Sequence, residues 1–140
     1  MGEQVVEGGC ICGQVRYSIT GKPYAVAACH CENCRKQSGA AFSVNLIVAP
    51  AAVTITGELT GYEDSRSDSG QPVIRQFCGS CGSPIRSVPQ STPGLVAIKA
   101  GTLDDPSPHR PGMHIWASTK LDWVEIPEGV ARFEKGPTRG

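Results

Sequence analysis

Short segments in which apolar and polar side chains alternate recur along the chain and predict β-strands. In residues 14–20, QVRYSIT, the valine, tyrosine and isoleucine alternate with polar residues, and Val53 and Ile55 repeat this period of two. Such a period places every second side chain on one face of a sheet, so both segments predict half-buried strands. Further strands are predicted in residues 42–50, 72–77, 84–88 and 95–101, and two more in residues 114–126.

Other segments differ from this pattern. Residues 32–38, ENCRKQS, predict one short helix, which Gly39 ends because glycine readily adopts the left-handed conformation at a helix C-terminus. Residues 62–72, YEDSRSDSGQP, are the most polar stretch and predict a mobile surface loop. With 17 glycines and 11 prolines between short strands, the chain of 140 residues is expected to form a single, mainly β domain.

The charge pattern excludes several classes of partner. Thirteen basic residues balance thirteen acidic ones, and no basic run exceeds the pair Arg35–Lys36, so we expect neither nucleic acid nor a membrane surface as a partner. No segment approaches the roughly 20 apolar residues of a membrane span, and MGEQVVEGG lacks the features of a signal peptide. We therefore expect a cytoplasmic protein.

Seven cysteines are the strongest chemical feature of the sequence. An odd number cannot pair fully within one chain, and reducing compartments keep thiols free, so metal binding or thiol chemistry is favoured over disulfides. Cys78 and Cys81 flank a short turn between two predicted strands, which is the layout of a zinc knuckle. Because a knuckle supplies two ligands, a closed tetrahedral site needs another pair, and Cys10 and Cys12 provide it.

This division leaves Cys29, Cys31 and Cys34 as a three-cysteine set with one ligand position open. The spacing also permits other divisions, in which Cys29 or Cys31 joins the knuckle and the N-terminal pair is free. The three cysteines could instead be buried, unreactive thiols, or a redox pair, because Cys31 and Cys34 form a CxxC sequence. No thioredoxin-like βαβ pattern surrounds that pair, which disfavours the redox interpretation.

A zinc ion held by three thiolates carries a net negative charge and is a weak generator of hydroxide. The same soft site accepts a fourth sulfur, and coordination deprotonates an incoming thiol. The open set therefore predicts a site that captures a thiol and presents it to an electrophile. Arg35 and Lys36 follow the last ligand and are candidates for binding a carboxylate of that thiol, although exposed cations of a short helix are an equally good interpretation.

We expect different roles for two histidines near these motifs. His30 lies between two expected ligands, so its side chain should point away from the metal, and we predict a surface histidine. His114 is a candidate for substrate contact or proton transfer, although packing beside Trp116 is favoured. For the adjacent Asp104 and Asp105 a turn is favoured over acid–base catalysis.

The cysteine order C-x-C, C-x-C-x-x-C and C-x-x-C occurs together with CRKQSGAAF, FCGSCGSPI, AGTLDDP and HIW. In these motifs the sequence resembles the glutathione-dependent formaldehyde-activating enzyme family, which includes the centromere protein V-like proteins. The resemblance runs from about Gly8 to Phe133, nearly the whole chain.

The resemblance implies a β-tent fold of twisted antiparallel sheets with a zinc-knuckle hairpin, one or two short helices and two zinc ions. It assigns Cys10, Cys12, Cys78 and Cys81 to a structural zinc, and Cys29, Cys31 and Cys34 to a catalytic one. The implied reaction joins glutathione and formaldehyde into S-hydroxymethylglutathione and is classed as a carbon–sulfur lyase reaction. The alternatives are a carrier that binds glutathione or another thiol without turnover and a zinc-binding scaffold that binds a protein partner.

Overall fold

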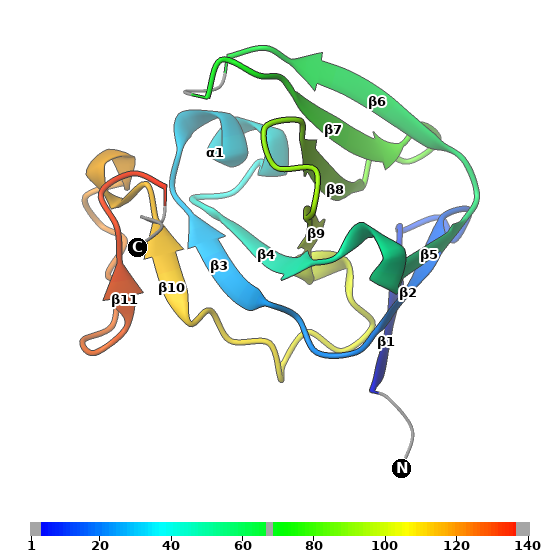
Figure 1. Cartoon of the computed structure of the whole chain (residues 1–140), viewed down its shortest axis with the longest axis horizontal. Coiled ribbons are helices and arrows are strands. Elements are labelled where there is room, and N and C mark those ends of the chain that lie inside the picture. Colours follow the sequence, from blue (N-terminus) through cyan, green and yellow to red (C-terminus); the bar gives the residue numbers. More distant parts are fainter. Residues whose placement is uncertain (1–3, 67–68, 137–140) are drawn as a thin grey trace.

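The computed structural model describes residues 4–66 and 69–136, which form a mainly β protein with one α-helix, as the sequence predicts (Figure 1). Its regular elements, in chain order, are β1 (Val5–Gly9), β2 (Arg16–Thr20), β3 (Ala25–Cys29), α1 (Glu32–Ser38), β4 (Ser43–Val48), β5 (Val53–Thr56), β6 (Leu59–Asp64), β7 (Val73–Cys78), β8 (Pro84–Pro89), β9 (Val96–Lys99), β10 (Met113–Ile115) and β11 (Ala131–Arg132). Three short 3-10 turns lie at Pro50–Ala52, Ala100–Thr102 and Ala117–Thr119.

The strands form two sheets. The smaller one has the order β1-β2-β5 and is antiparallel throughout. The larger one has eight strands in the order β11-β10-β3-β4-β9-β8-β7-β6. The expectation of antiparallel sheets needs one correction, because β10 runs parallel to both of its neighbours, β3 and β11. In Figure 1 the smaller sheet stands at the lower right of the larger one.

The central strands of the larger sheet present different side chains on their two faces, because successive residues of a strand point to opposite sides. Their apolar face packs against the smaller sheet in one hydrophobic core, which includes Leu46, Val48, Val96 and Ile98 from β4 and β9, and Val15, Tyr17 and Ile19 from the region of β2. The alternate residues of β4 and β9 lie on the opposite face, where Asn45, Ile47, Ala97 and Lys99 line a cavity.

Helix α1 has the predicted limits, and its two ends explain why. At its start, the Sγ atom of Cys31 accepts a hydrogen bond from the backbone N–H of Cys34, at 3.2 Å. At its end, Gly39 adopts a φ of 68° and donates its N–H to the carbonyl oxygen of Arg35. The cap thus fixes two cysteines relative to each other within one helical turn.

Two predictions about the strands were wrong. Residues 62–64 belong to β6, whose side chains are mostly exposed because this strand lies at the edge of the sheet and pairs with β7. The predicted mobility of the loop rests in part on residues 67 and 68, which lie outside the described residues. Residues 114–126 hold one strand instead of two, because Trp116 takes a left-handed φ of 57° and a 3-10 turn follows it.

Four strands were not predicted: β1, β3, β6 and β11. The sequence of β3, AVAAC, has no polar positions to alternate with, and three of its five residues are buried. Among the described residues, no helix is long and apolar enough to cross a membrane.

Candidate functional site

Four cysteines gather where the turn between β1 and β2 meets the hairpin between β7 and β8. The Sγ atoms of Cys10, Cys12, Cys78 and Cys81 all lie within 4.8 Å of one another. Cys12 Sγ lies 3.5 Å from Cys10 Sγ and 3.7 Å from Cys78 Sγ. A tetrahedral zinc with Zn–S bonds of 2.3 Å places its sulfur ligands about 3.8 Å apart, so the spacing of this four-cysteine group fits a zinc ion.

Backbone groups hold this arrangement. The N–H of Val15 donates to Cys10 Sγ at 3.2 Å, and the N–H of Ile11 donates to Ser83 Oγ at 3.1 Å, which ties the N-terminal turn to the knuckle. The pKa of the Cys81 thiol is lowered to about 5, first by its hydrogen bonds with Ser83, so its thiolate is favoured at neutral pH. The spacing of the four Sγ atoms therefore makes this group suited to bind a cation.

The other three cysteines form a separate group beside helix α1. The Sγ atoms of Cys29, Cys31 and Cys34 lie within 4.8 Å of one another; Cys29 ends β3, Cys31 caps the helix and Cys34 lies in its first turn. Among the described residues, no other cysteine, histidine or carboxylate belongs to this three-cysteine group. The seven thiols are thus divided four and three, and the divisions in which Cys29 or Cys31 joins the knuckle are not found.

The three-cysteine group opens into a cavity of about 490 Å³ on the polar face of the larger sheet. This volume is in the range of small-molecule sites. The face of the larger sheet forms the floor of the cavity and carries both apolar residues, such as Ile47 and Ala97, and polar ones, such as Asn45 and Lys99. The lining also includes Ala27, Val73, Arg75, Ser87, Leu95, Ile115 and Trp116. By contrast, no member of the four-cysteine group lines this cavity.

Arg75 is a buried cation beside the thiols and is 7% exposed. Its Nη2 atom lies 2.9 Å from Asp64 Oδ2, its Nη1 atom donates to Ser87 Oγ at 3.1 Å, and Nη1 lies 3.9 Å from Cys34 Sγ. Burial alone would raise the pKa of Asp64, but the hydrogen bonds from Arg66 N–H and from Arg75 outweigh it and lower that pKa. The ion pair thus fixes Arg75 with its guanidinium against the three-cysteine group.

Lys99 is a second buried cation at the cavity and is 5% exposed. Its Nζ atom donates to Ser43 Oγ at 2.9 Å. The pKa of the Cys34 thiol is lowered to about 2, first by hydrogen bonds from Cys29 and Cys31, and further by the charges of Lys99 and Arg75. These contacts and charges favour the thiolate form of Cys34, whereas interaction with the neighbouring thiols and burial raise the pKa of Cys29.

The sequence interpretation missed three polar residues of this cavity, Asn45, Arg75 and Lys99, and also Asp64, which pairs with Arg75 and lines the adjoining cavity. The available indication was a basic residue within a predicted strand, Arg75 in VIRQF and Lys99 in VAIK. Lysine and arginine are seldom buried without a partner, so such positions suggest a polar site. Which face of the sheet these residues share depends on strand pairing, which the sequence pattern did not specify.

The prediction that His30 lies on the surface was wrong, because it is 1% exposed. Its Nε2 atom lies 2.8 Å from Nδ1 of His114, and its ring centroid lies 4.9 Å from that of Phe42. His30 does not belong to the three-cysteine group, and its ring packs against Phe42 and against His114 of β10. His114 is buried as well, at 6% exposed, and is absent from the described lining of the cavity.

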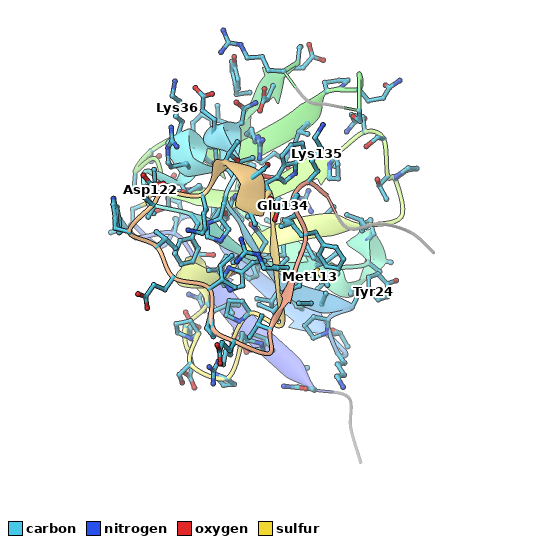
Figure 2. All side chains as sticks on the ribbon, turned by 90° about the vertical axis from the view of Figure 1, so that its left-hand side faces the viewer. Tyr24, Lys36, Met113, Asp122, Glu134 and Lys135 are labelled. Atoms are coloured by element: carbon cyan, nitrogen blue, oxygen red, sulfur yellow. The ribbon has the colours of Figure 1, made fainter. Side chains whose placement is uncertain are left out.

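The predicted carboxylate-binding residues lie outside the main cavity. Lys36 pairs with Glu32 at 3.1 Å and lines an adjoining cavity of about 340 Å³ together with Asn33, Tyr62 and Arg66. Figure 2 shows Lys36 at the outer edge of the molecule. Arg35 is absent from the described lining of both cavities. Contact of Arg35, Lys36 and His114 with a substrate stays a prediction.

The neighbouring carboxylates Asp104 and Asp105 make contacts within the fold. Arg16 forms two hydrogen bonds with Asp104, of 2.9 Å and 2.5 Å, and Asp105 accepts from the hydroxyl and N–H of Ser107. The turn interpretation agrees with the contacts of Asp105, whereas Asp104 pairs with a residue of strand β2, Arg16.

Comparisons with known proteins agree with this geometry. The sequence pattern of the family described as glutathione-dependent formaldehyde-activating enzyme matches residues 5–119. A search of curated proteins finds no match. Among solved structures, a crystal structure of a Rhodobacter sphaeroides protein shares 16% sequence identity, with a TM-score of 0.55, over 91% of this chain and 98% of that one. At this identity the likeness shows a shared fold.

Proposed function

Because this chain belongs to the glutathione-dependent formaldehyde-activating enzyme family, we propose that it is a zinc-dependent enzyme of the carbon–sulfur lyase type. Its reaction joins the thiol of glutathione to formaldehyde, giving S-hydroxymethylglutathione, and cleaves the same bond in reverse. The observation that carries this proposal is that three thiols open into a cavity, while the other four close on one another at the knuckle.

Zinc is the metal that fits both groups, since thiolates are soft ligands and a set of four matches the tetrahedral preference of this ion. Cys10, Cys12, Cys78 and Cys81 would hold a structural zinc, and Cys29, Cys31 and Cys34 a second one with a free position. Bound at the second position, zinc would lower the pKa of an incoming thiol and keep its sulfur ionised near neutral pH.

The residues of the cavity supply orientation and charge. Asp64 neutralises Arg75, so this guanidinium serves to position the helix and its cysteines. The apolar lining residues, which include Ile47, Val73 and Leu95, exclude water and strengthen every charge interaction at the thiols. Lys36 and Arg66 of the adjoining cavity bind a carboxylate of glutathione, because Arg66 lines both cavities and connects them.

Exchange NMR of glutathione with formaldehyde tests the proposal. The variant of choice is Cys31→Ser, because serine is a good helix cap and preserves α1 while removing one thiolate ligand. The wild-type protein should accelerate exchange between free and hydroxymethylated glutathione, whereas Cys31→Ser and chelator-treated protein should leave it at the uncatalysed rate. Restoring zinc to the treated wild-type protein is the control, and it should restore exchange.

Exchange that is identical with wild-type protein, with Cys31→Ser and with no protein would refute the enzyme proposal. Calorimetry with glutathione then separates the two remaining functions. Stoichiometric binding without acceleration favours a thiol carrier, and capture of a protein partner without thiol binding favours a scaffold.

A further inference from the structure

Lys99 and Asn45 lie side by side on the floor of the cavity. They are register partners on the antiparallel strands β9 and β4, and each is 5% exposed. Both line the same cavity as the three-cysteine group. Their position on the larger sheet brings an ammonium and a side-chain amide to the space that the thiols face.

A chain of hydrogen bonds determines which groups these two residues offer. Lysine is a donor without acceptor capacity, so Ser43 Oγ accepts from Lys99 Nζ, at 2.9 Å. The hydroxyl proton of Ser43 is then available to Asn45 Oδ1, at 3.2 Å. With its oxygen used in this way, Asn45 has its NH2 group as the remaining polar group. The pair therefore presents N–H donors from both an ammonium and an amide.

The charge of Lys99 has no carboxylate partner among the residues that the structure describes. Arg75 on the same floor differs, because Asp64 neutralises it. A buried ammonium without an anion is costly, so its position calls for negative charge in the cavity. A ligand oxygen that becomes negative in the cavity, which Lys99 and the three cysteines line together, would supply that charge.

Given the proposed function, on which this inference rests, we propose that Lys99 and Asn45 bind the aldehyde oxygen and stabilise the negative charge that it acquires. In the forward direction the thiolate sulfur attacks the carbonyl carbon and a C–S bond forms. The π electron pair of the C=O bond moves to oxygen, which takes the proton that the thiol released on binding. In reverse, the hydroxyl loses its proton, the C=O bond reforms, and sulfur leaves with the electron pair of the C–S bond.

The role of such donors is to stabilise charge that develops in the transition state, and loss of one typically slows catalysis by about 10²–10³-fold. The test uses Lys99→Met, which keeps the length of the side chain and removes its charge, and Lys99→Arg, which keeps a cation with N–H donors. Asn45→Leu removes the amide donors at nearly constant size. Lys22→Met is the matched control, because Lys22 is exposed and outside the described lining of the cavity.

Three quantities are measured for each zinc-loaded variant: the exchange rate at saturating glutathione and formaldehyde, the glutathione Kd by calorimetry, and the zinc content. We expect Lys99→Met to slow exchange by about 100-fold and Asn45→Leu by about 10-fold or more, with Kd and zinc content within two-fold of wild type. Lys99→Arg should recover part of the loss, and Lys22→Met should match wild type.

Exchange within three-fold of wild type in Lys99→Met would overturn this inference while leaving the proposed function intact. Joint loss of exchange, thiol affinity and zinc in Lys99→Met would also overturn it, because Lys99 would then serve only as a counter-charge to the cysteines. If Lys99→Met does not fold, unchanged exchange in Asn45→Leu overturns the proposal and slowed exchange supports it. A wild-type protein without activity would refute the proposed function itself.

Discussion

At the scale of single residues, charge in the cavity is organised by two buried cations with different partners. Arg75 is held by Asp64, with both side chains 9% exposed, whereas Lys99 is hydrogen-bonded to the neutral hydroxyl of Ser43. Asn33 adds a further tie, since its Nδ2 atom donates to both carboxylate oxygens of Asp64. Asp64 therefore connects helix α1, strand β6 and Arg75 at one point.

Replacing Asp64 with asparagine should destabilise the protein strongly. Removing one member of a buried ion pair leaves the other charge uncompensated and typically costs about 3–5 kcal/mol. Urea unfolding followed by circular dichroism measures this loss. Asp104→Asn is the matched control, because the ion pair of Asp104 with Arg16 is exposed and should contribute little to the free energy of unfolding. Equal effects of the two substitutions would show that Asp64 has no special structural role.

The same carboxylate should make stability depend on pH. Because the pKa of Asp64 is lowered in the folded protein, the unfolded chain binds a proton first as the pH falls. The stabilisation is thus complete above about pH 4, the ordinary carboxyl pKa, and is lost as the pH falls through the lower folded value. The difference in unfolding free energy between wild type and Asp64→Asn should shrink over that window, and a constant difference would contradict this assignment.

At the scale of elements, strands with one exposed face and the capped helix were predictable from sequence. The alternation around Val15 and Tyr17 correctly predicted β2, and Gly39 correctly marked the end of α1. The pattern failed where both faces of a strand have similar surroundings: β3 has small apolar residues on both faces, and β6 is mostly exposed. Ligand counting favoured the division of the cysteines into four and three without excluding other divisions, and the family resemblance implied it. The partners of Lys99 and Arg75 depend on pairings between strands far apart in the chain.

One tight turn between elements should be particularly sensitive to substitution. Gly57, between β5 and β6, has a φ of 91°, and a Cβ atom there would overlap the carbonyl oxygen of Gln14, next to the four-cysteine group. Gly21 has a similar φ of 86° but open space around it, so both alanine variants share the left-handed backbone cost of about 1–2 kcal/mol. Gly57→Ala should lower the Tm clearly more than Gly21→Ala, and equal shifts would contradict the crowding argument.

At the scale of the whole molecule, the larger sheet lies between the hydrophobic core and the candidate site. One face packs with the smaller sheet into the hydrophobic core, and the other face carries the cavity with the three-cysteine group. The four-cysteine group joins the N-terminal turn to the β7–β8 hairpin, so it links segments of both sheets. A metal bound there would connect the two sheets across the core.

Loss of the four-cysteine group should therefore cost stability, and loss of the three-cysteine group should cost activity. Cys78→Ser should destabilise by several kcal/mol, because structural zinc contributes about 10–16 kcal/mol of apparent binding energy in small zinc peptides. Cys31→Ser should leave the Tm near that of wild type, since serine keeps the helix cap. Calorimetric melting of both zinc-loaded variants checks this, and a larger loss in Cys31→Ser would reverse the assignment of the two groups.

In the proposed function, a zinc ion held by the three-cysteine group takes the sulfur of a substrate thiol as its fourth ligand. A crystal structure of the zinc-loaded protein with glutathione, using anomalous scattering to locate the metal, tests it most directly. We expect two zinc ions per chain, one bound by Cys10, Cys12, Cys78 and Cys81, and one bound by Cys29, Cys31 and Cys34 together with the glutathione sulfur. Bound glutathione with its sulfur away from the second zinc, or a protein side chain in that fourth position, would contradict it.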